Sequence, residues 1–397
     1  SNLRITGNSI TGTVKTCIGI KVLGDVGTSN SIDGVIIADN VIDGCKKSIS
    51  VDKVKGKVDI VRNSIKNDSA ATEALVATRH SVYINDIMGA AKLSIIGNSF
   101  TGGSNSGGAI HFDRSLDPQT ASEVHVVLKD NFFDRMGQHA DWSNGATVLN
   151  DMALVYINGK AATDRIKTFH ASGNSYDFTS ALAGTYGLWV KDISETCTFD
   201  SILEFGAVGD GSVDCTVAIN RASAAAGVGG SINIPGGTFL VSDYGVANGA
   251  STTASATPTH TCIQPIYDNQ IWSGSGTLTV PAGVNEVLLD LGAAITGTLV
   301  SGLTFLGDAT NVGRAIRMIA LSGSGIHGTV DACKISLFGT GVSAYGPGSS
   351  VTNCSIENCK TYGIDGGVDS VSTDLNVSHN TITFAAGSAA GIGIYVK

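Results

Sequence analysis

The chain has 397 residues, a formal net charge of −9 and only 15% charged residues, with 51 glycines and 6 prolines. The acidic balance and the absence of a basic block argue against non-specific nucleic-acid binding. No apolar run reaches the length that crosses a membrane. Abundant glycine together with Val, Ile, Ser, Thr and Asn favours many short strands joined by tight turns. A chain of this length can bury one large core or two.

The chain contains 8 cysteines and no CxxC pair. This pattern argues against a zinc site and favours buried free thiols over a disulfide framework. The histidines lie at scattered positions in the repeat. The sequence therefore predicts neither a metal site nor a cofactor.

Residues 1–192 carry a degenerate repeat of the form h-x-h-x-x-N-x-h, where h is apolar. Alternation with period two predicts a strand with one buried face, and the Asn then lies at a bend between two strands. Coils that stack in register would place these Asn side chains in a hydrogen-bonded ladder. The repeated residues are Asn8, Asn40, Asn63, Asn98, Asn131 and Asn174.

A second set of apolar pairs interleaves strictly with the Asn positions. Such an order predicts a solenoid of stacked coils, each of which buries its apolar side against its neighbours. The pairs are Ile20/Val22, Ile49/Val51, Val82/Ile84, Ile110/Phe112, Val155/Ile157 and Leu188/Val190.

A different pattern follows a predicted connector at 193–203. Residues 204–290 contain a glycine turn at 206–211 and an amphipathic helix at about 214–226. Two predicted strands, Ser231–Ile234 and Thr238–Val241, flank a Pro-Gly-Gly turn. The repeat then returns at 291–397, with Cys333 and Cys354 at the Asn position.

This order of turn, helix, strand, Pro-Gly-Gly turn and strand resembles the opening of pectate-lyase-like proteins and bacteriophage tailspikes. The resemblance is specific over about forty residues and departs from the family at Cys215, where a second Asp is usual. In that family the motif seals the first coil of a right-handed, single-stranded parallel β-helix. The resemblance implies an all-β fold of two such helices in tandem, 1–192 without its own cap and 291–397 continuing beyond the chain end. A trimmed or permuted chain, in which 299–397 lead into 1–192, is the alternative.

The residues between the two buried members of each apolar pair are expected to point outward. In register, Tyr83, His111, Tyr156 and Trp189 would form one column, and an acid and amide column would lie beside it. Aromatic rings beside hydrogen-bonding groups suit a sugar chain. The alternative is that these rings only pack against a loop or a neighbouring subunit.

The largest insertion lies between Asn131 and Val155 and follows the coil that carries His111. Glycoside hydrolysis needs two carboxyl groups, and Asp113 with Asp134 or Asp141 is the predicted pair. An eliminating lyase would instead need a base such as His111, His139 or Arg114, and an ordinary solvated loop is the third interpretation. The candidate catalytic residues are Asp113, Asp134 and Asp141, and the candidate sugar-binding residues are Tyr83, His111, Arg114, Trp142, Tyr156 and Trp189.

Together these features and the resemblance predict a spike on the virion tail, associated with other tail proteins. Members of the family that the chain resembles are usually homotrimers, so the resemblance implies a homotrimer. It would bind and depolymerise a bacterial surface polysaccharide such as a capsule, an exopolysaccharide or an O-antigen, by hydrolysis in preference to elimination. No nucleic-acid or membrane partner is expected. The alternatives are a non-catalytic structural or receptor-binding fibre module and a secreted polysaccharide lyase or hydrolase.

Overall fold

A computed structural model describes most of the chain. The described residues are 2–12, 17–24, 32–67, 80–85, 87–104, 106–113, 123–138, 153–159, 166–178, 181, 185–191, 193–242, 261–263, 265, 267–282, 287–291, 296–310, 313–318, 328–345, 347–366, 374–384 and 391–396. The chain divides into two compact units, Ser1–Gly206 and Ala207–Lys397. Each unit is described by itself below.

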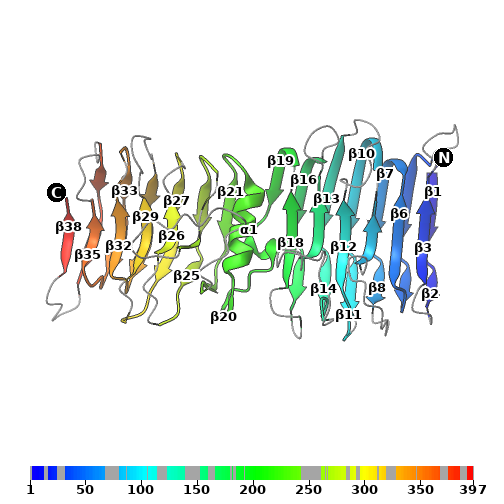
Figure 1. Ribbon diagram of the computed structural model, residues 1–397, viewed down its shortest axis with the longest axis horizontal. Coiled ribbons are helices and arrows are strands. Elements are labelled where there is room, and N and C mark those ends of the chain that lie inside the picture. The colour runs from blue at the N-terminus through cyan, green and yellow to red at the C-terminus, as the bar shows by residue number, and fades with distance from the viewer. Residues whose placement is uncertain are drawn as a thin grey trace. The chain divides into compact units, whose positions relative to one another are not determined.

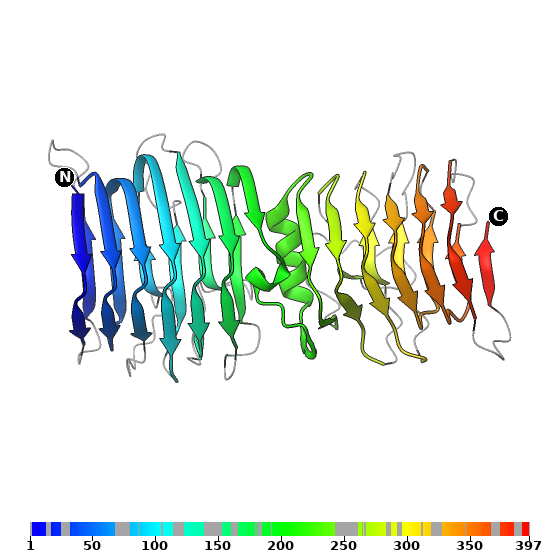
Figure 2. The ribbon, with the colours of Figure 1, turned by 180° about the vertical axis from the view of Figure 1, so that it is seen from behind.

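The described residues of the first unit form three sheets, named A, B and C, whose strands run as parallel rows in Figures 1 and 2. Sheet A contains β1 (Asn2–Thr6), β4 (Gly34–Ala38), β7 (Val54–Val61), β10 (Ile87–Ile96), β13 (Val124–Lys129), β16 (Ile166–Ser172) and β19 (Ile193–Phe199). Sheet B contains β2 (Ser9–Thr11), β5 (Val41–Asp43), β8 (Ser64–Asn67), β11 (Ser99–Gly102), β14 (Phe132–Asp134) and β17 (Ser175–Asp177). Sheet C contains β3 (Ile18–Leu23), β6 (Lys47–Asp52), β9 (His80–Ile84), β12 (Gly108–Asp113), β15 (Ala153–Asn158) and β18 (Tyr186–Lys191).

Each strand from β1 to β16 pairs in parallel with the strand three positions further along the chain, as β1 does with β4 and β4 with β7. Three consecutive strands thus form one coil, and the coils stack in series, an arrangement consistent with a β-helix. The predicted apolar pairs face the interior, because Val82, Ile84, Ile110 and Phe112 are all fully buried. The prediction of an all-β chain of stacked parallel coils is confirmed at this level.

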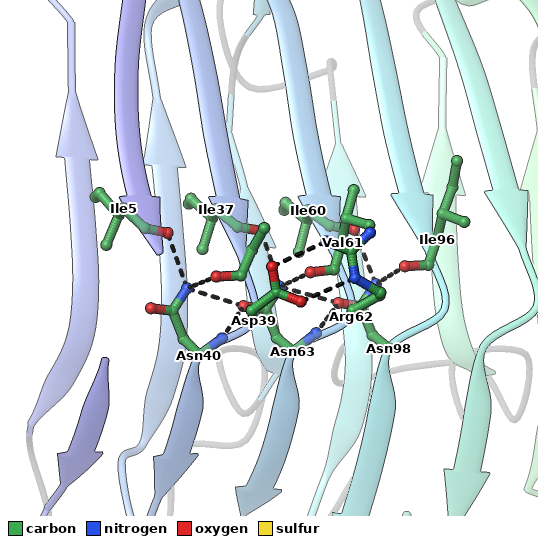
Figure 3. Close-up of polar contacts among 11 residues, drawn as sticks. Ile5, Ile37, Asp39, Asn40, Ile60, Val61, Arg62, Asn63, Ile96 and Asn98 are labelled. Atoms are coloured by element: carbon green, nitrogen blue, oxygen red, sulfur yellow. Dashed lines mark hydrogen bonds and ion pairs between the residues drawn. The ribbon is translucent and has the colours of Figure 1, made fainter. Parts of the chain in front are cut away.

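The predicted ladder of Asn side chains is present at the bend between sheets A and B (Figure 3). The Nδ2 group of Asn63 donates to Oδ1 of Asn98 over 3.0 Å and to the carbonyl oxygen of Ile37 over 2.9 Å. Its own Oδ1 accepts from the backbone N–H and from Nδ2 of Asn40, at 3.1 and 3.0 Å. The same bonds recur from Asn8 to Asn174, so the buried amides satisfy one another.

A carboxylate ends the ladder. Glu204 lies in the 3-10 helix η2 (Ile202–Phe205) and is 2% exposed. Its Oε2 accepts from Asn174 Nδ2 over 2.7 Å, and its Oε1 accepts from the Asn174 backbone N–H over 3.2 Å. Burial raises the pKa of Glu204 to about 7, although these two hydrogen bonds lower it. This closing residue was not predicted, because it lies outside the repeat.

The described residues of the second unit form three further parallel sheets, named D, E and F. Sheet D contains β20 (Asp210–Asp214), β22 (Thr238–Leu240), β25 (Thr277–Thr279), β28 (Thr304–Leu306), β31 (Lys334–Ser336), β34 (Ser355–Glu357) and β37 (Thr381–Thr383). Sheet E contains β21 (Ser231–Ile234), β24 (Ile271–Gly274), β27 (Leu299–Ser301), β30 (Thr329–Asp331), β33 (Ser350–Thr352) and β36 (Asn376–Ser378). Sheet F contains β23 (Thr261–Ile263), β26 (Val287–Leu291), β29 (Arg314–Met318), β32 (Thr340–Ala344), β35 (Tyr362–Asp365) and β38 (Ile392–Tyr395).

In this unit cysteines replace asparagines at two positions of the bend. The backbone N–H groups of Lys334, Ser355 and Thr381 bond to the carbonyl oxygens of residues 303, 333 and 354, which repeats the bend of the first unit. Cys333 and Cys354 therefore occupy the Asn position, as predicted. Both are free thiols, as are the other cysteines whose side chains the structure describes. Cys17 and Cys197 are half-buried, and the others are buried. The prediction of free thiols is confirmed for the described cysteines.

The predicted amphipathic helix is α1 (Thr216–Ala226), and it packs Ala218, Ile219 and Ala222 into the interior of the second unit. Asp214 caps its first turn, because its Oδ1 accepts from the backbone N–H of Thr216 over 2.9 Å. Cys215 makes no such capping bond. At the other end the helix stops at Gly227, which has a φ of 69°.

The segment 193–203, expected to be a connector, contains strand β19 and the start of η2, and it belongs to the first unit. In the part of the chain that the structure describes, no helix combines the length and the apolar character needed to cross a membrane.

Candidate functional site

The outward face of sheet C carries the predicted aromatic column, defined as Tyr83, His111, Tyr156 and Trp189. The register of β9, β12, β15 and β18 places these residues directly opposite one another on successive strands. The column is half-buried, and His111 within it is only 7% exposed. The prediction that these side chains form one outward column is confirmed.

The rings of the column stack on one another. Tyr83 and His111 have ring centroids 5.1 Å apart and planes 6° apart. His111 and Tyr156 are 4.9 Å apart at 9°, and Tyr156 and Trp189 are 4.5 Å apart at 5°. Ring faces that cover one another are not free to stack on a sugar. The ring faces between neighbours in the column are therefore covered, and sugar binding by these residues stays a prediction.

A lysine covers the free face of Tyr83. The Lys47 ammonium lies 4.0 Å from the centroid of the Tyr83 ring, on the side of the preceding strand β6. Burial lowers the pKa of Lys47, and the positive charges of Lys46 and Lys21 lower it further. This end of the column is therefore positively charged.

The second predicted column lies one position further along the same strands. Asp52 stands opposite Leu23, and its Oδ1 accepts a hydrogen bond from Asn85 Nδ2 over 3.1 Å. Further on, Asn158 stands opposite both Asp113 and Lys191. Among the described side chains, the acid Asp52 and the amides Asn85 and Asn158 occupy the position beside the rings that the sequence predicted.

The structure does not bring Asp134 next to Asp113. Asp113 is the last residue of β12, whereas the backbone N–H of Gly137 bonds to the carbonyl oxygen of Gly107, just before that strand begins. The five residue steps of β12 span about 16 Å. Asp134, on β14 of sheet B, therefore lies near the start of β12, whereas Asp113 lies at the end of that strand. The Asp113 side chain and all of Arg114, His139, Asp141 and Trp142 lie outside the described residues.

The structure instead places Asp134 beside Asp177. The two residues are directly opposite each other on β14 and β17 of sheet B. Neighbouring parallel strands are about 4.8 Å apart, and paired side chains point to the same face. The two carboxyl groups therefore lie side by side on one face of sheet B, and retaining glycosidases use two carboxyl groups about 5–5.5 Å apart.

Arg135 binds the carboxylate of Asp134. Its Nε lies 3.2 Å from Asp134 Oδ1, and its Nη2 lies 3.2 Å from Oδ2. Its backbone N–H also donates to the carbonyl oxygen of Asp177 over 3.3 Å. The side chain of Asp134 is 21% exposed, so solvent can reach it. Arg135 therefore joins the two strands and balances the charge of one carboxylate.

An exposed aromatic ring lies on the same face. Phe132, two residues before Asp134 on β14, is 45% exposed. It stands between Ser99 and Ser175 on the two neighbouring strands. Within the described residues no aromatic ring stacks on Phe132, in contrast to the sheet C column. Its ring can therefore meet the C–H face of a sugar beside the two carboxylates.

Sequence reasoning missed Asp177 and Phe132, although the repeat contains the signal. Asp134 and Asp177 occupy the same position, three residues after Asn131 and Asn174 respectively. Aligning the repeat on its Asn residues would have paired the two acids. The sequence was aligned on its buried apolar residues and on the outward residues of sheet C. The outward residues of sheet B were not compared from coil to coil.

No metal centre accompanies either face, since the described residues contain no group of three or more His, Cys, Asp or Glu side chains suited to a metal ion. The chain matches no protein-family model, no curated protein and no solved structure.

Proposed function

We propose that the protein binds a bacterial surface polysaccharide and hydrolyses it at Asp134 and Asp177 on the outer face of sheet B. The observation that carries this proposal is the register pair of these two carboxylates beside the exposed ring of Phe132. A retaining glycoside hydrolase requires two neighbouring carboxyl groups, and this register pair supplies two. Phe132 would hold the sugar ring next to them.

The roles follow from the surroundings of each carboxylate. Asp134, which pairs with Arg135, attacks the anomeric carbon as the glycosidic C–O bond breaks, and Asp177 gives a proton to the leaving oxygen. Asp177 then takes a proton from water, whose oxygen displaces Asp134 from the anomeric carbon. The net reaction consumes one water molecule and needs no cofactor.

The proposal includes a right-handed, pectate-lyase-like β-helix in a homotrimeric spike on the virion tail. The resemblance of 205–242 to the opening of that family supports it, as do the parallel sheets and the helix α1 that follows the glycine turn. The pairing of Asp113 with Asp141 stays a prediction.

A non-catalytic receptor-binding module is the second candidate. The stacked column on sheet C favours it, because rings that cover one another stiffen a surface without leaving a face for a reacting sugar. Such a module would bind polysaccharide and leave it intact.

The test uses a panel of bacterial capsules and O-antigens incubated with the wild-type protein. Reducing ends without the ultraviolet absorbance of an unsaturated sugar indicate hydrolysis, and both signals together indicate a lyase. Asp134→Asn and Asp177→Asn should each lower the rate by more than about a hundredfold, since each removes one of the two required groups. Asp43→Asn is the matched control, because Asp43 lies in the same outward row of sheet B on an earlier coil. Full activity in both variants of the pair would refute the proposed site.

A further inference from the structure

Two thiols from successive coils meet at the corner between sheets B and C. Cys17 lies just before β3 in the first coil, and Cys45 lies between β5 and β6 in the second coil. Burial and a hydrogen bond to the thiol of Cys17 raise the pKa of the Cys45 thiol. A Cβ atom added at Gly12 would meet the sulfur of Cys17 at 2.3 Å and that of Cys45 at 2.8 Å. The two sulfurs therefore lie beside one another.

The backbone around the two cysteines has the spacing that a disulfide needs. The backbone N–H groups of Lys46 and Lys47 donate to the carbonyl oxygen of Cys17 over 3.1 and 3.4 Å. Ile18 then stands directly opposite Lys47, where β3 and β6 begin. Backbones paired in this way lie about 4.8 Å apart, and disulfides join Cα atoms about 4.4–6.8 Å apart. The two sulfurs can therefore be joined without a large movement of the backbone.

The exposure of the two thiols sets the order in which they react. Cys17 is half-buried, whereas Cys45 is 1% exposed. A dissolved reagent therefore reaches Cys17 first, and Cys45 is the neighbouring thiol that completes a disulfide. The thiols of Cys333 and Cys354 also share a hydrogen bond, but they are only 1% and 2% exposed. Of these two pairs, the first is thus the one that a reagent reaches in the folded protein.

We propose that Cys17 and Cys45 form a reversible disulfide when the protein meets a small-molecule disulfide, and that this bond links the first coil to the second. The Cys17 thiolate attacks one sulfur of the reagent and releases the other half as a thiol. Cys45 then loses its proton and attacks the Cys17 sulfur of the mixed disulfide, which releases the second half as a thiol. Two electrons pass from the protein to the reagent, and the products are the protein disulfide and two small thiols.

The link joins a coil that is paired on one side to a coil that is paired on both. Within the described strands, β1, β2 and β3 each stand at the end of their sheet and pair only with β4, β5 and β6. Local opening of such a coil breaks contacts on one side alone, so a covalent bond to the next coil should suppress it. The proposal does not depend on the proposed function, because neither cysteine lies on the outer face of sheet B.

The experiment incubates the reduced wild-type protein with oxidised glutathione, alkylates the remaining thiols and maps the cysteine peptides by mass spectrometry. The wild type should form the Cys17–Cys45 disulfide, and dithiothreitol should reverse it. Cys45→Ser should instead keep glutathione on Cys17, because no second thiol displaces it. Cys17→Ser should leave Cys45 reduced. Cys197→Ser is the matched control, because Cys197 is a half-buried cysteine of the same unit, and it should form the disulfide as the wild type does.

Hydrogen exchange by mass spectrometry measures the effect on the fold. Oxidation should slow the exchange of the Ile18–Leu23 amides at least about tenfold in the wild type and leave it unchanged in Cys45→Ser. A Cys17 that stays reduced or keeps its glutathione in the wild type, or equal exchange before and after oxidation, overturns the inference. A Cys333–Cys354 disulfide that forms as fast also overturns it, since exposure would then not select the pair.

Discussion

Breaking the Asn ladder in its middle should strongly destabilise the first unit. Asn98 lies in its middle and is 1% exposed. In Asn98→Ala, the Asn63 backbone N–H and Asn63 Nδ2 lose the oxygen that accepts from them at 2.9 and 3.0 Å. Each buried donor left without an acceptor costs about 1–3 kcal/mol. We expect Asn98→Ala to lower the free energy of unfolding by about 4 kcal/mol.

Asn8→Ala is the matched control at the other end of the same ladder. Asn8 is exposed, and no described group donates to its side chain. The Oδ1 of Asn40 loses one donor but still accepts from the Asn8 backbone N–H over 3.0 Å. We therefore expect Asn8→Ala to cost less than about 1 kcal/mol, within the range of a solvent-exposed hydrogen bond.

Urea unfolding followed by circular dichroism gives the free-energy difference. Hydrogen exchange by mass spectrometry then shows whether the loss is confined to residues 2–206, with the second unit as an internal reference. If Asn98→Ala and Asn8→Ala lower the free energy of unfolding by amounts within about 0.5 kcal/mol of each other, the reasoning is refuted. The ladder would then not owe its stability to the burial of its amides and the hydrogen bonds between them.

Three further predictions concern single groups. Glu204 has a pKa of about 7 in the folded chain against an ordinary value of 4.5, so its contribution to stability is complete below pH 4.5 and is lost as pH rises through about 7. The loss in the free energy of unfolding is about 3 kcal/mol. The Glu204→Gln variant should not show this loss when its unfolding is measured as a function of pH. The same pH profile for the variant and the wild type would contradict the assignment. Tyr156→Ala should cost about 2–3 kcal/mol in thermal unfolding because it removes two ring stacks, and Tyr156→Phe should cost less than about 0.5 kcal/mol. In the second unit, Arg317→Met deprives the 4% exposed Asp290 of its guanidinium partner and should cost about 3–5 kcal/mol, with a smaller cost in the Asp290→Asn/Arg317→Met double variant.

The sequence predicted the elements that repeat. An Asn after two alternating apolar residues recurs six times, so its place at a bend and its ladder could be inferred before any coordinates. Register followed as well, because one face of each strand had to be buried. The alignment of Tyr83, His111, Tyr156 and Trp189 on successive strands could therefore be predicted.

Features outside the repeat could not be obtained in this way. Glu204 ends the ladder from a short helix that shares no pattern with the coils, so only the fold brings it to Asn174. The register showed that the rings are neighbours, but their rotamers decide that each covers the face of the next. Asp113 and Asp134 looked like partners because they are close in sequence. In the structure Asp134 lies near the start of strand β12 and Asp113 lies at its end.

The stereochemistry of cleavage tests the proposed site most directly. The polysaccharide that the wild-type protein cleaves fastest is digested in an NMR tube, and the anomeric configuration of the first reducing ends is recorded before mutarotation. The two aspartates lie side by side on strands about 4.8 Å apart, so the proposed site predicts retention of configuration. Inversion, which needs carboxyl groups about 6.5–9.5 Å apart, would contradict the assignment of Asp134 and Asp177.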